Sequence, residues 1–265
     1  MCELFALSSH KPVDADFSLT ALARSGSLER HMNDGWGVAY YQEKDARLIK
    51  DTVAAEDSAW LKFLESHTLT SDVVLAHIRK ASIGARRFRN TQPYYRELGG
   101  RRHVFVHNGS LPGIFDASEI RLNRFHPIGE TDSEYAFCAM LGELESLWHC
   151  NRLPTDRQRF ECVNDFAARM RALGPANFLY TDGDLLFAHS HQRIQDDGEL
   201  RPPGLFFLKR TCAASADVLE EQGISLRNQN LELTLFASVP LTSETWEPMQ
   251  VGQVMCTRQG QSLRF

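Results

Sequence analysis

The chain opens with Met1-Cys2-Glu3-Leu4-Phe5-Ala6-Leu7, a cysteine directly after the initiator methionine followed by an apolar run. Residues 3–7 are too few for a helix, and polar residues 8–12 follow them, so they predict a short buried strand. If Met1 is removed, Cys2 carries a free α-amine that can act as general base for its own thiol. The two groups titrate at about pH 8 and about pH 8.5. Taken alone, Cys2 is more simply explained as a small buried residue.

The composition is that of a globular protein with a sizeable core. The 265 residues suit one large domain or two small ones, with 43% hydrophobic and 24% charged residues. A net charge of −5 argues against general nucleic-acid binding. No apolar run approaches the roughly 20 residues of a membrane span, and the N-terminus lacks the basic flank and apolar core of a signal peptide. We therefore expect a cytoplasmic protein with no nucleic-acid or membrane partner.

The cysteines and histidines give no sign of a metal site. Besides Cys2, the five scattered cysteines form no C-x-x-C pair, so neither zinc nor a disulfide framework is indicated. His77 and His107 lie near other motifs but have no ligand-spaced partner, which makes a metal hydrolase a distant alternative. We expect both to be strand-end or core histidines. The five cysteines expected to be reduced and structural are Cys138, Cys150, Cys162, Cys212 and Cys256.

Hydrophobic patterning predicts two sheets, with two principal helices in the middle of the chain. Turn signals and apolar runs place further strands at 38–41, 48–50, 73–79, 103–107, 177–181, 185–189, 204–208, 231–239 and 251–258. Helical spacing and cap residues place helices at 17–23, 58–64, 131–148 and 157–173. These elements indicate an α/β sandwich in one domain.

Two polar motifs have ordinary structural explanations. Asn108-Gly109 stops the predicted strand 103–107, and alone it indicates a tight turn. Thr131 and Glu134 have the spacing of a capping box at the start of a helix. Asp132, in the first turn of that helix, would be stabilised there by the helix dipole.

Taken together, the motifs resemble those of class II glutamine amidotransferases, which are N-terminal-nucleophile hydrolases. They occur in that family's order: Cys2, Asp34-Gly35-Trp36-Gly37, Arg79, His107-Asn108-Gly109 and Thr131-Asp132-Ser133-Glu134. Further segments are similar to the stand-alone bacterial YafJ-type group, at 76–79, 134–138 and 240–246. The resemblance covers essentially the whole chain. It implies a four-layer αββα sandwich with a single amidotransferase domain over residues 1–265.

The resemblance also assigns roles to residues. Cys2 would attack the side-chain amide of glutamine and form a thioester. Asn108, through its side-chain amide, and Gly109, through its backbone N–H, would stabilise the oxyanion, each such donor being worth roughly 3–4 kcal/mol. Arg79 would hold the substrate α-carboxylate, a task suited to a planar guanidinium. Asp132 would hold the α-ammonium.

Two further residues are expected beside the substrate. Trp36 matches the segment next to the catalytic residue, where packing is its main role. Gln92 stands where many family members have a histidine that lines the glutamine pocket, and glutamine can hydrogen-bond but cannot carry charge. The resemblance implies no cofactor.

Two classes of function stay open. One is an enzyme that hydrolyses glutamine or a γ-glutamyl conjugate. Large family members carry a second domain that uses the ammonia, and its lack here leaves room for a separate ammonia-accepting partner protein. The other is a non-catalytic partner or regulator that keeps the fold. Joint retention of Cys2, Arg79, Asn108 and Asp132 favours the enzyme.

Overall fold

The computed structural model describes residues 2–17, 22, 34–67, 69–80, 84–148, 152–212, 224–227 and 231–265. The helices bounded within this part are α2 (Ala59–Glu65), α3 (Asp132–Glu145) and α4 (Asp156–Leu173), with short 3-10 turns η1 (Ala55–Asp57), η2 (Phe88–Asn90) and η3 (Ile114–Asp116). The strands are β1 (Glu3–Phe17), β2 (Trp36–Gln42), β3 (Asp45–Asp51), β4 (Thr70–Ile78), β5 (Tyr94–Leu98), β6 (Arg101–Gly109), β7 (Ala176–Thr181), β8 (Leu186–His189), β9 (Arg193–Ile194), β10 (Leu200–Arg201), β11 (Phe206–Cys212), β12 (Ile224–Arg227), β13 (Leu231–Ala237), β14 (Glu247–Pro248), β15 (Val254–Arg258) and β16 (Gln261–Leu263). None of the helices in the described part is long and apolar enough to cross a membrane.

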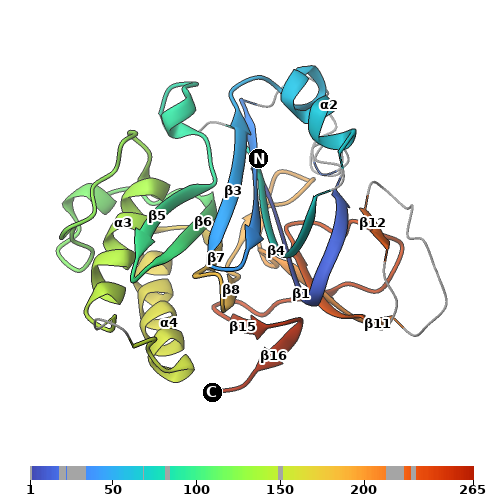
Figure 1. Cartoon of the computed structure of the whole chain (residues 1–265). Coiled ribbons are helices and arrows are strands. Elements are labelled where there is room, and N and C mark those ends of the chain that lie inside the picture. Colours follow the sequence, from blue (N-terminus) through green and yellow to red (C-terminus); the bar gives the residue numbers. More distant parts are fainter. Residues whose placement is uncertain are drawn as a thin grey trace.

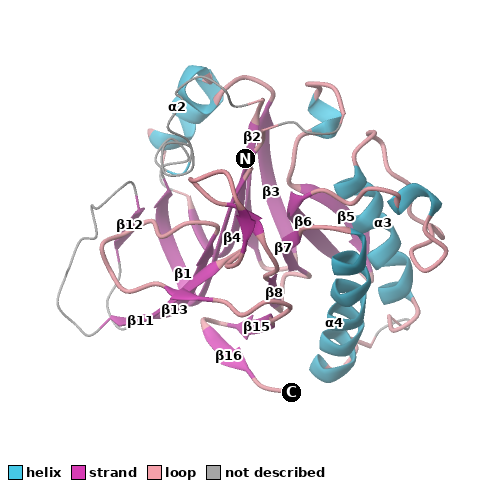
Figure 2. Ribbon diagram, turned by 180° about the vertical axis from the view of Figure 1, so that it is seen from behind, coloured by secondary structure: helices cyan, strands magenta, loops and turns pink. Residues whose placement is uncertain are grey.

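Apart from the short pair β9 and β10, the described strands form two large antiparallel sheets. The eight-stranded sheet has the order β14-β11-β13-β1-β4-β2-β3, with β12 also paired to β1, and the six-stranded sheet has the order β16-β15-β8-β7-β6-β5. Figures 1 and 2 show the helices α3 and α4 beside the six-stranded sheet and α2 beside the other sheet. The molecule is therefore the four-layer αββα sandwich that the resemblance implied.

The two sheets meet through side chains that alternate along each strand. Leu4 and Ala6 of β1 lie in one buried cluster with Val104 and Val106 of β6, and this cluster fills the layer between the sheets. The intervening Phe5 belongs to a different cluster, on the outer face of the eight-stranded sheet, where α2 packs. The start of β1 therefore lies against the end of β6, across the layer between the sheets.

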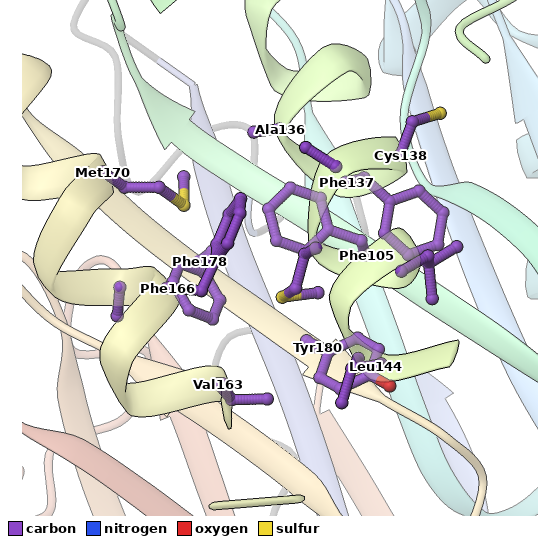
Figure 3. Close-up of a cluster of buried hydrophobic side chains, with 14 of the residues drawn as sticks. Phe105, Ala136, Phe137, Cys138, Leu144, Val163, Phe166, Met170, Phe178 and Tyr180 are labelled. Carbon is purple, nitrogen blue, oxygen red and sulfur yellow. The ribbon is translucent and has the colours of Figure 1, made fainter. Parts of the chain in front are cut away.

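An aromatic cluster joins α3 and α4 to the outer face of the six-stranded sheet (Figure 3). Phe105 of β6 stacks on Phe137 of α3 with ring centroids 5.3 Å apart, and the Phe178 ring lies 5.4 Å from Phe105. Phe166 and Met170 of α4 complete this side of the cluster. Burying one such side chain contributes about 1.5–3 kcal/mol. The cluster therefore holds the first turn of α3 in a fixed position beside β6.

Side-chain caps start two of the described helices where the sequence predicts them. Ser58 accepts a hydrogen bond from the amide three residues further on, at the start of α2. Thr131 likewise accepts from the Glu134 amide at the start of α3. Glu134 does not complete the predicted capping box, because its carboxylate binds Arg96 at 2.7 Å instead. One such cap contributes about 1 kcal/mol.

The first strand is longer than the sequence predicts. β1 spans Glu3–Phe17 and passes through the polar residues 8–12, so the predicted strand end after residue 7 is wrong. Its pairing with β4 shifts register between Ser8 and Val13, and such an irregularity lets a strand carry an exposed polar insertion. The helix predicted over residues 17–23 lies almost wholly outside the described residues.

A buried histidine in the six-stranded sheet makes stability sensitive to acid. His103 Nδ1 lies 2.7 Å from the Tyr180 hydroxyl, and Nε2 lies 3.1 Å from the Leu98 carbonyl oxygen. Because the carbonyl only accepts, Nε2 carries the proton and Nδ1 accepts from the tyrosine. Burial lowers the pKa of His103 to about 4. The folded protein therefore holds this ring neutral at pH values where the unfolded chain binds a proton.

We predict that His103→Gln makes the unfolding free energy less dependent on pH. The contribution of His103 is present above its unfolded pKa of about 6.5 and is lost as the pH falls towards the folded value. Between about pH 7.5 and about pH 5 this histidine alone should lower the unfolding free energy by about 2 kcal/mol. Urea titrations at the two pH values measure the difference. The exposed His126 provides the control, since His126→Gln should keep the wild-type pH dependence. Equal pH dependence in wild type and His103→Gln would contradict the prediction.

Candidate active site

The N-terminal end of β1 lies in the middle of the eight-stranded sheet, between β13 and β4. Glu3 pairs with Ile78 of β4, so Cys2 lies beside the residues that follow β4. The Cys2 Sγ lies 3.2 Å from both the backbone nitrogen and the carbonyl oxygen of Lys80. Strand pairing on both sides thus fixes the backbone that carries the predicted nucleophile.

The Cys2 thiol is half-buried, and its surroundings keep it protonated. Burial raises the pKa of the Cys2 thiol, against the lowering effects of the Lys80 amide and the Arg79 charge. The net shift is upward, so little thiolate is present at neutral pH. Attack by this sulfur therefore requires a nearby base that removes its proton.

Asn108 reaches Cys2 from the opposite sheet. Val104 and Val106 of β6 face the layer between the sheets, and the two-residue alternation puts Asn108 on the same face. Its Nδ2 donates to the Cys2 carbonyl oxygen at 2.6 Å. Asn108 is also paired with Asn177 of β7, so the Asn-Gly motif continues a strand and the tight-turn alternative is wrong.

Gly109 is required by close packing at the end of β6. It pairs with Ala176 of β7. A Cβ at this position would lie 1.9 Å from the Pro175 carbonyl oxygen and 2.8 Å from His107 Nε2. No side chain fits in this space, so glycine is needed for the close approach of the two backbones.

Arg79 is buried next to the cysteine and holds the Asp-Gly motif. Its Nη2 donates to the Gly84 carbonyl oxygen at 2.9 Å. Its backbone N–H donates to Gly35 at 2.8 Å, and its carbonyl oxygen accepts from the Asp34 amide at 2.8 Å. Gly35 has a φ of 132°, a backbone conformation that residues with a side chain rarely adopt. Backbone hydrogen bonds therefore join the Asp34-Gly35 turn to Arg79, beside Cys2.

Asp132 ties the first turn of α3 to the chain around the Asn-Gly motif. Its Oδ2 accepts from the Leu111 amide at 2.8 Å, and its Oδ1 accepts from the Ser133 amide at 2.8 Å. The Ser133 hydroxyl lies 2.9 Å from His107 Nδ1. The start of α3 thus contacts the residues on either side of Asn108-Gly109, and the helix dipole favours the carboxylate there.

Gln92 uses both ends of its amide on the backbone of β6. Its Nε2 donates to the His107 carbonyl oxygen at 3.1 Å, and its Oε1 accepts from the His107 amide at 2.6 Å. A charged histidine could not make this pair of contacts in the same way, because it has no acceptor. We therefore keep Gln92 among the site residues as one that positions the strand before Asn108.

Trp36 lies on the far side of the eight-stranded sheet from Cys2. Its side chain is fully buried in the outer cluster with Phe5 and Val38. The next residue, Gly37, contacts the site instead: a Cβ there would lie 2.3 Å from the Gln92 carbonyl oxygen. We therefore keep Trp36 as a packing residue and not as a substrate contact.

Comparison with known proteins places the entire chain in one family. The family model described as glutamine amidotransferases class-II matches residues 1–265. The chain belongs to the class II glutamine amidotransferases. The family as a whole acts on the amide of glutamine, by hydrolysis or by transfer of its nitrogen.

The relatives of this amidotransferase include proteins of similar length. The Escherichia coli K12 protein YafJ, which bears a provisional name as a glutamine amidotransferase, is 33% identical over 255 residues, 96% of either chain. The structure of a predicted glutamine amidotransferase from Pseudomonas aeruginosa has a TM-score of 0.71 at 27% identity and covers 100% of both chains. The B. subtilis glutamine phosphoribosylpyrophosphate amidotransferase, of which this chain covers 49%, shares the fold, with a TM-score of 0.61 at 13% identity.

The histidines near the motifs of the amidotransferase are core residues, as predicted. Burial and the Arg79 charge lower the pKa of His77 to about 3. Burial also lowers the pKa of His107, whose Nδ1 is bonded to Ser133. Both rings are therefore neutral at physiological pH. Across the described residues, no three His, Cys, Asp or Glu side chains are grouped so as to hold a metal ion.

Sequence reasoning missed a buried ion pair beside Cys2, the predicted nucleophile. Glu3 is 2% exposed and Arg193 is 4% exposed, and Arg193 Nη1 lies 3.1 Å from Glu3 Oε2. Burial raises the pKa of Glu3 to about 7, while the Arg193 charge opposes the shift. An acidic residue within the apolar start of β1 was the available signal, because a buried carboxylate needs a partner. The partner itself, 190 residues away, gives no comparable signal.

Proposed function

We propose that this amidotransferase hydrolyses the γ-amide of glutamine or of a γ-glutamyl conjugate, with Cys2 as nucleophile after removal of Met1. One observation carries this proposal: the Asn108 Nδ2 lies 2.6 Å from the Cys2 carbonyl oxygen, which supplies an amide donor next to the thiol. Met1 lies outside the described residues. We treat residues 1–265 as one catalytic domain.

The first half of the reaction forms a thioester. The Cys2 α-amine takes the thiol proton, and Sγ forms a bond to the amide carbon of the substrate. The carbonyl electron pair moves to oxygen, and Asn108 with the Gly109 N–H would stabilise the resulting oxyanion. When the C–N bond breaks, the α-ammonium passes its proton to the nitrogen, which leaves as ammonia or as an amine.

The second half regenerates the enzyme. The α-amine of Cys2 removes a proton from water, and the oxygen attacks the thioester carbon. Collapse of this intermediate breaks the C–S bond and releases glutamate. The thiolate regains the proton from the α-ammonium. Released ammonia would go to solvent or to an ammonia-accepting partner protein.

Arg79 and Asp132 are suited to grip the glutamyl group by its charged end. Both side chains are buried, with 3% and 4% exposure. Both charges also act on the Tyr94 hydroxyl: burial raises the pKa of Tyr94, Arg79 opposes the rise and Asp132 adds to it. The two charges are thus within electrostatic range of a common point, as a clamp for an α-carboxylate and an α-ammonium requires.

We predict strict selection for an intact γ-glutamyl group and looser selection for the leaving amine. Removing the α-amine or the α-carboxylate of the substrate removes its charge-assisted contact with Asp132 or Arg79, which costs more than a changed leaving group. A panel of γ-glutamyl amides, with asparagine and analogues lacking either charged group, measures kcat/KM. Truncated analogues that react as fast as glutamine would exclude Arg79 and Asp132 as the clamp. A free, reactive Cys2 that turns over no γ-glutamyl compound would favour the non-catalytic alternative.

A matched pair of variants separates the clamp from general damage. Arg79→Lys keeps the positive charge but loses bidentate geometry, so we expect kcat/KM for glutamine to fall about 10- to 100-fold, chiefly through KM. Arg210→Lys is the control, because Arg210 is also buried but binds Glu244, outside the candidate site. It should leave the kcat/KM of the folded protein unchanged. Equal losses in the two variants would indicate that Arg79 is needed only for folding.

A further inference from the structure

The segment His191–Arg193 links β1, which carries Cys2, to β6, which carries Asn108, through hydrogen bonds of side chains. It enters β9 after the six-stranded sheet strand β8. One end is held by Asn177, which also holds Asn108, and the other end carries Arg193, which binds Glu3. Together with the Asn108–Cys2 contact, these bonds close a ring through both sheets.

Asn177 is the fixed point of this ring on the β6 side. It is fully buried. Its Nδ2 donates one hydrogen bond to the Asn108 carbonyl oxygen at 3.0 Å and another to the Gln192 carbonyl oxygen at 2.8 Å. Its Oδ1 accepts from the His191 amide at 2.7 Å. Both amide protons are used, so the side chain has one satisfied orientation.

Glycine at position 204 completes the seat of Asn177. A Cβ on Gly204 would lie 1.6 Å from Asn177 Oδ1. The Gly204 and Leu205 amides in turn donate to the Ser190 hydroxyl at 3.2 Å and 3.0 Å, next to the connecting segment. The segment is therefore held from two sides before it reaches Arg193.

On the Cys2 side the ring closes through the contact between Arg193 and Glu3. Arg193 and Glu3 are almost fully removed from solvent and lie 3.1 Å apart. The Glu3 backbone is covalently joined to Cys2, and the next amide, that of Leu4, donates to Ser238 Oγ at 2.9 Å. A buried pair of this kind adds little to stability compared with an apolar pair of the same size. Its place in the ring points to a different use.

We propose that Glu3, Arg193 and Asn177 form a brace that sets the distance between Cys2 and Asn108. The inference rests on the proposed function, in which that distance decides how well the oxyanion is met. The three are positioning residues: none needs to touch substrate. Because a misplacement of about 1 Å can cost about 10²-fold in rate, loss of the brace should lower kcat and leave KM nearly unchanged.

The test removes the brace without leaving a buried charge. In Glu3→Gln/Arg193→Met both charges are absent, so the variant should fold, and we expect kcat to fall about 10- to 100-fold. Arg193→Lys keeps a charge and should recover part of the loss. Asn177→Ala should lower kcat similarly. The combination of Asn177→Ala with the neutral pair should be no worse than either alone, because all break one ring.

The matched control is Arg210→Met/Glu244→Gln, which neutralises a different Arg–Glu pair. Its kcat should equal that of wild type. Wild-type kcat in Glu3→Gln/Arg193→Met, or losses that multiply in the combined variant, would overturn the brace.

Hydrogen exchange separates this inference from the proposed function. In the neutral-pair variant, amides at the start of β1 and at the end of β6 should exchange faster, and in the control variant they should not. If wild type turns over no γ-glutamyl amide, the proposed function fails, and this exchange result alone decides the brace. Unchanged exchange at both strand ends would overturn it.

Discussion

Replacing Cys2 by alanine should abolish amide hydrolysis and leave the fold intact. We expect kcat to fall at least about 10⁴-fold, because the reaction has no covalent route without the sulfur. The side chain is half-buried and, among the described residues, its sulfur contacts the Lys80 backbone, so the free energy of unfolding should change by less than about 1 kcal/mol. Steady-state ammonia release and urea denaturation measure the two quantities.

Two further variants complete this experiment. Cys2→Ser replaces sulfur by oxygen and should also be strongly impaired, because a hydroxyl is a weaker nucleophile. Cys256→Ala removes a buried cysteine from the helix-side core, and it should lose stability but keep kcat. Residual hydrolysis by Cys2→Ala at a tenth of the wild-type rate would mean that another group attacks the amide.

Replacing Asn108 by alanine should lower kcat by about 10²–10³-fold with a smaller effect on KM, because its amide acts chiefly on the developing oxyanion. The contact with the Cys2 carbonyl oxygen at 2.6 Å shows that the Nδ2 donor lies next to the nucleophile. Asn108→Asp keeps the shape but offers a carboxylate in place of the donor, so it should be at least as impaired. Initial rates over a range of glutamine concentrations separate kcat from KM.

A control for Asn108 must lose a buried hydrogen bond away from the site. Thr234 Oγ1 donates to the Gly260 carbonyl oxygen at 2.7 Å, and its side chain is fully buried in β13. Thr234→Val should therefore lower stability by about 1 kcal/mol and leave kcat unchanged. If Asn108→Ala raises KM and leaves kcat unchanged, Asn108 binds substrate and does not stabilise the transition state.

Local patterns in the sequence were sufficient for much of the fold. The short apolar run at residues 3–7 predicted a buried strand, and the caps at Ser58 and Thr131 predicted helix starts that the structure confirms. The end of β1 was mispredicted, because polar residues 8–12 resemble a loop, although a strand tolerates them where its pairing is irregular: Ser8 and Ser9 are buried, and residues 10–12 are exposed.

For the site residues, too, local patterns were insufficient wherever a long-range contact decides the role. The Asn-Gly motif has the composition of a turn, and only the pairing of Asn108 with Asn177, a long-range contact, shows that it continues a strand. Glu3 and Arg193 are joined by a contact that no sequence spacing could predict. Gln92 departs from the family pattern, and its bonds to His107 are visible only once β6 is in place.

Mass mapping of the protein after reaction with a glutamine-mimicking electrophile tests the central claim most directly. The reagent should add once, and the modified peptide should begin at Cys2, which establishes both the removal of Met1 and the identity of the nucleophile. Cys138 and Cys256 should stay unmodified because their side chains are buried. Full reaction in protein that retains Met1, or an adduct on Cys138 or Cys162, would contradict the assignment of Cys2 and its amine.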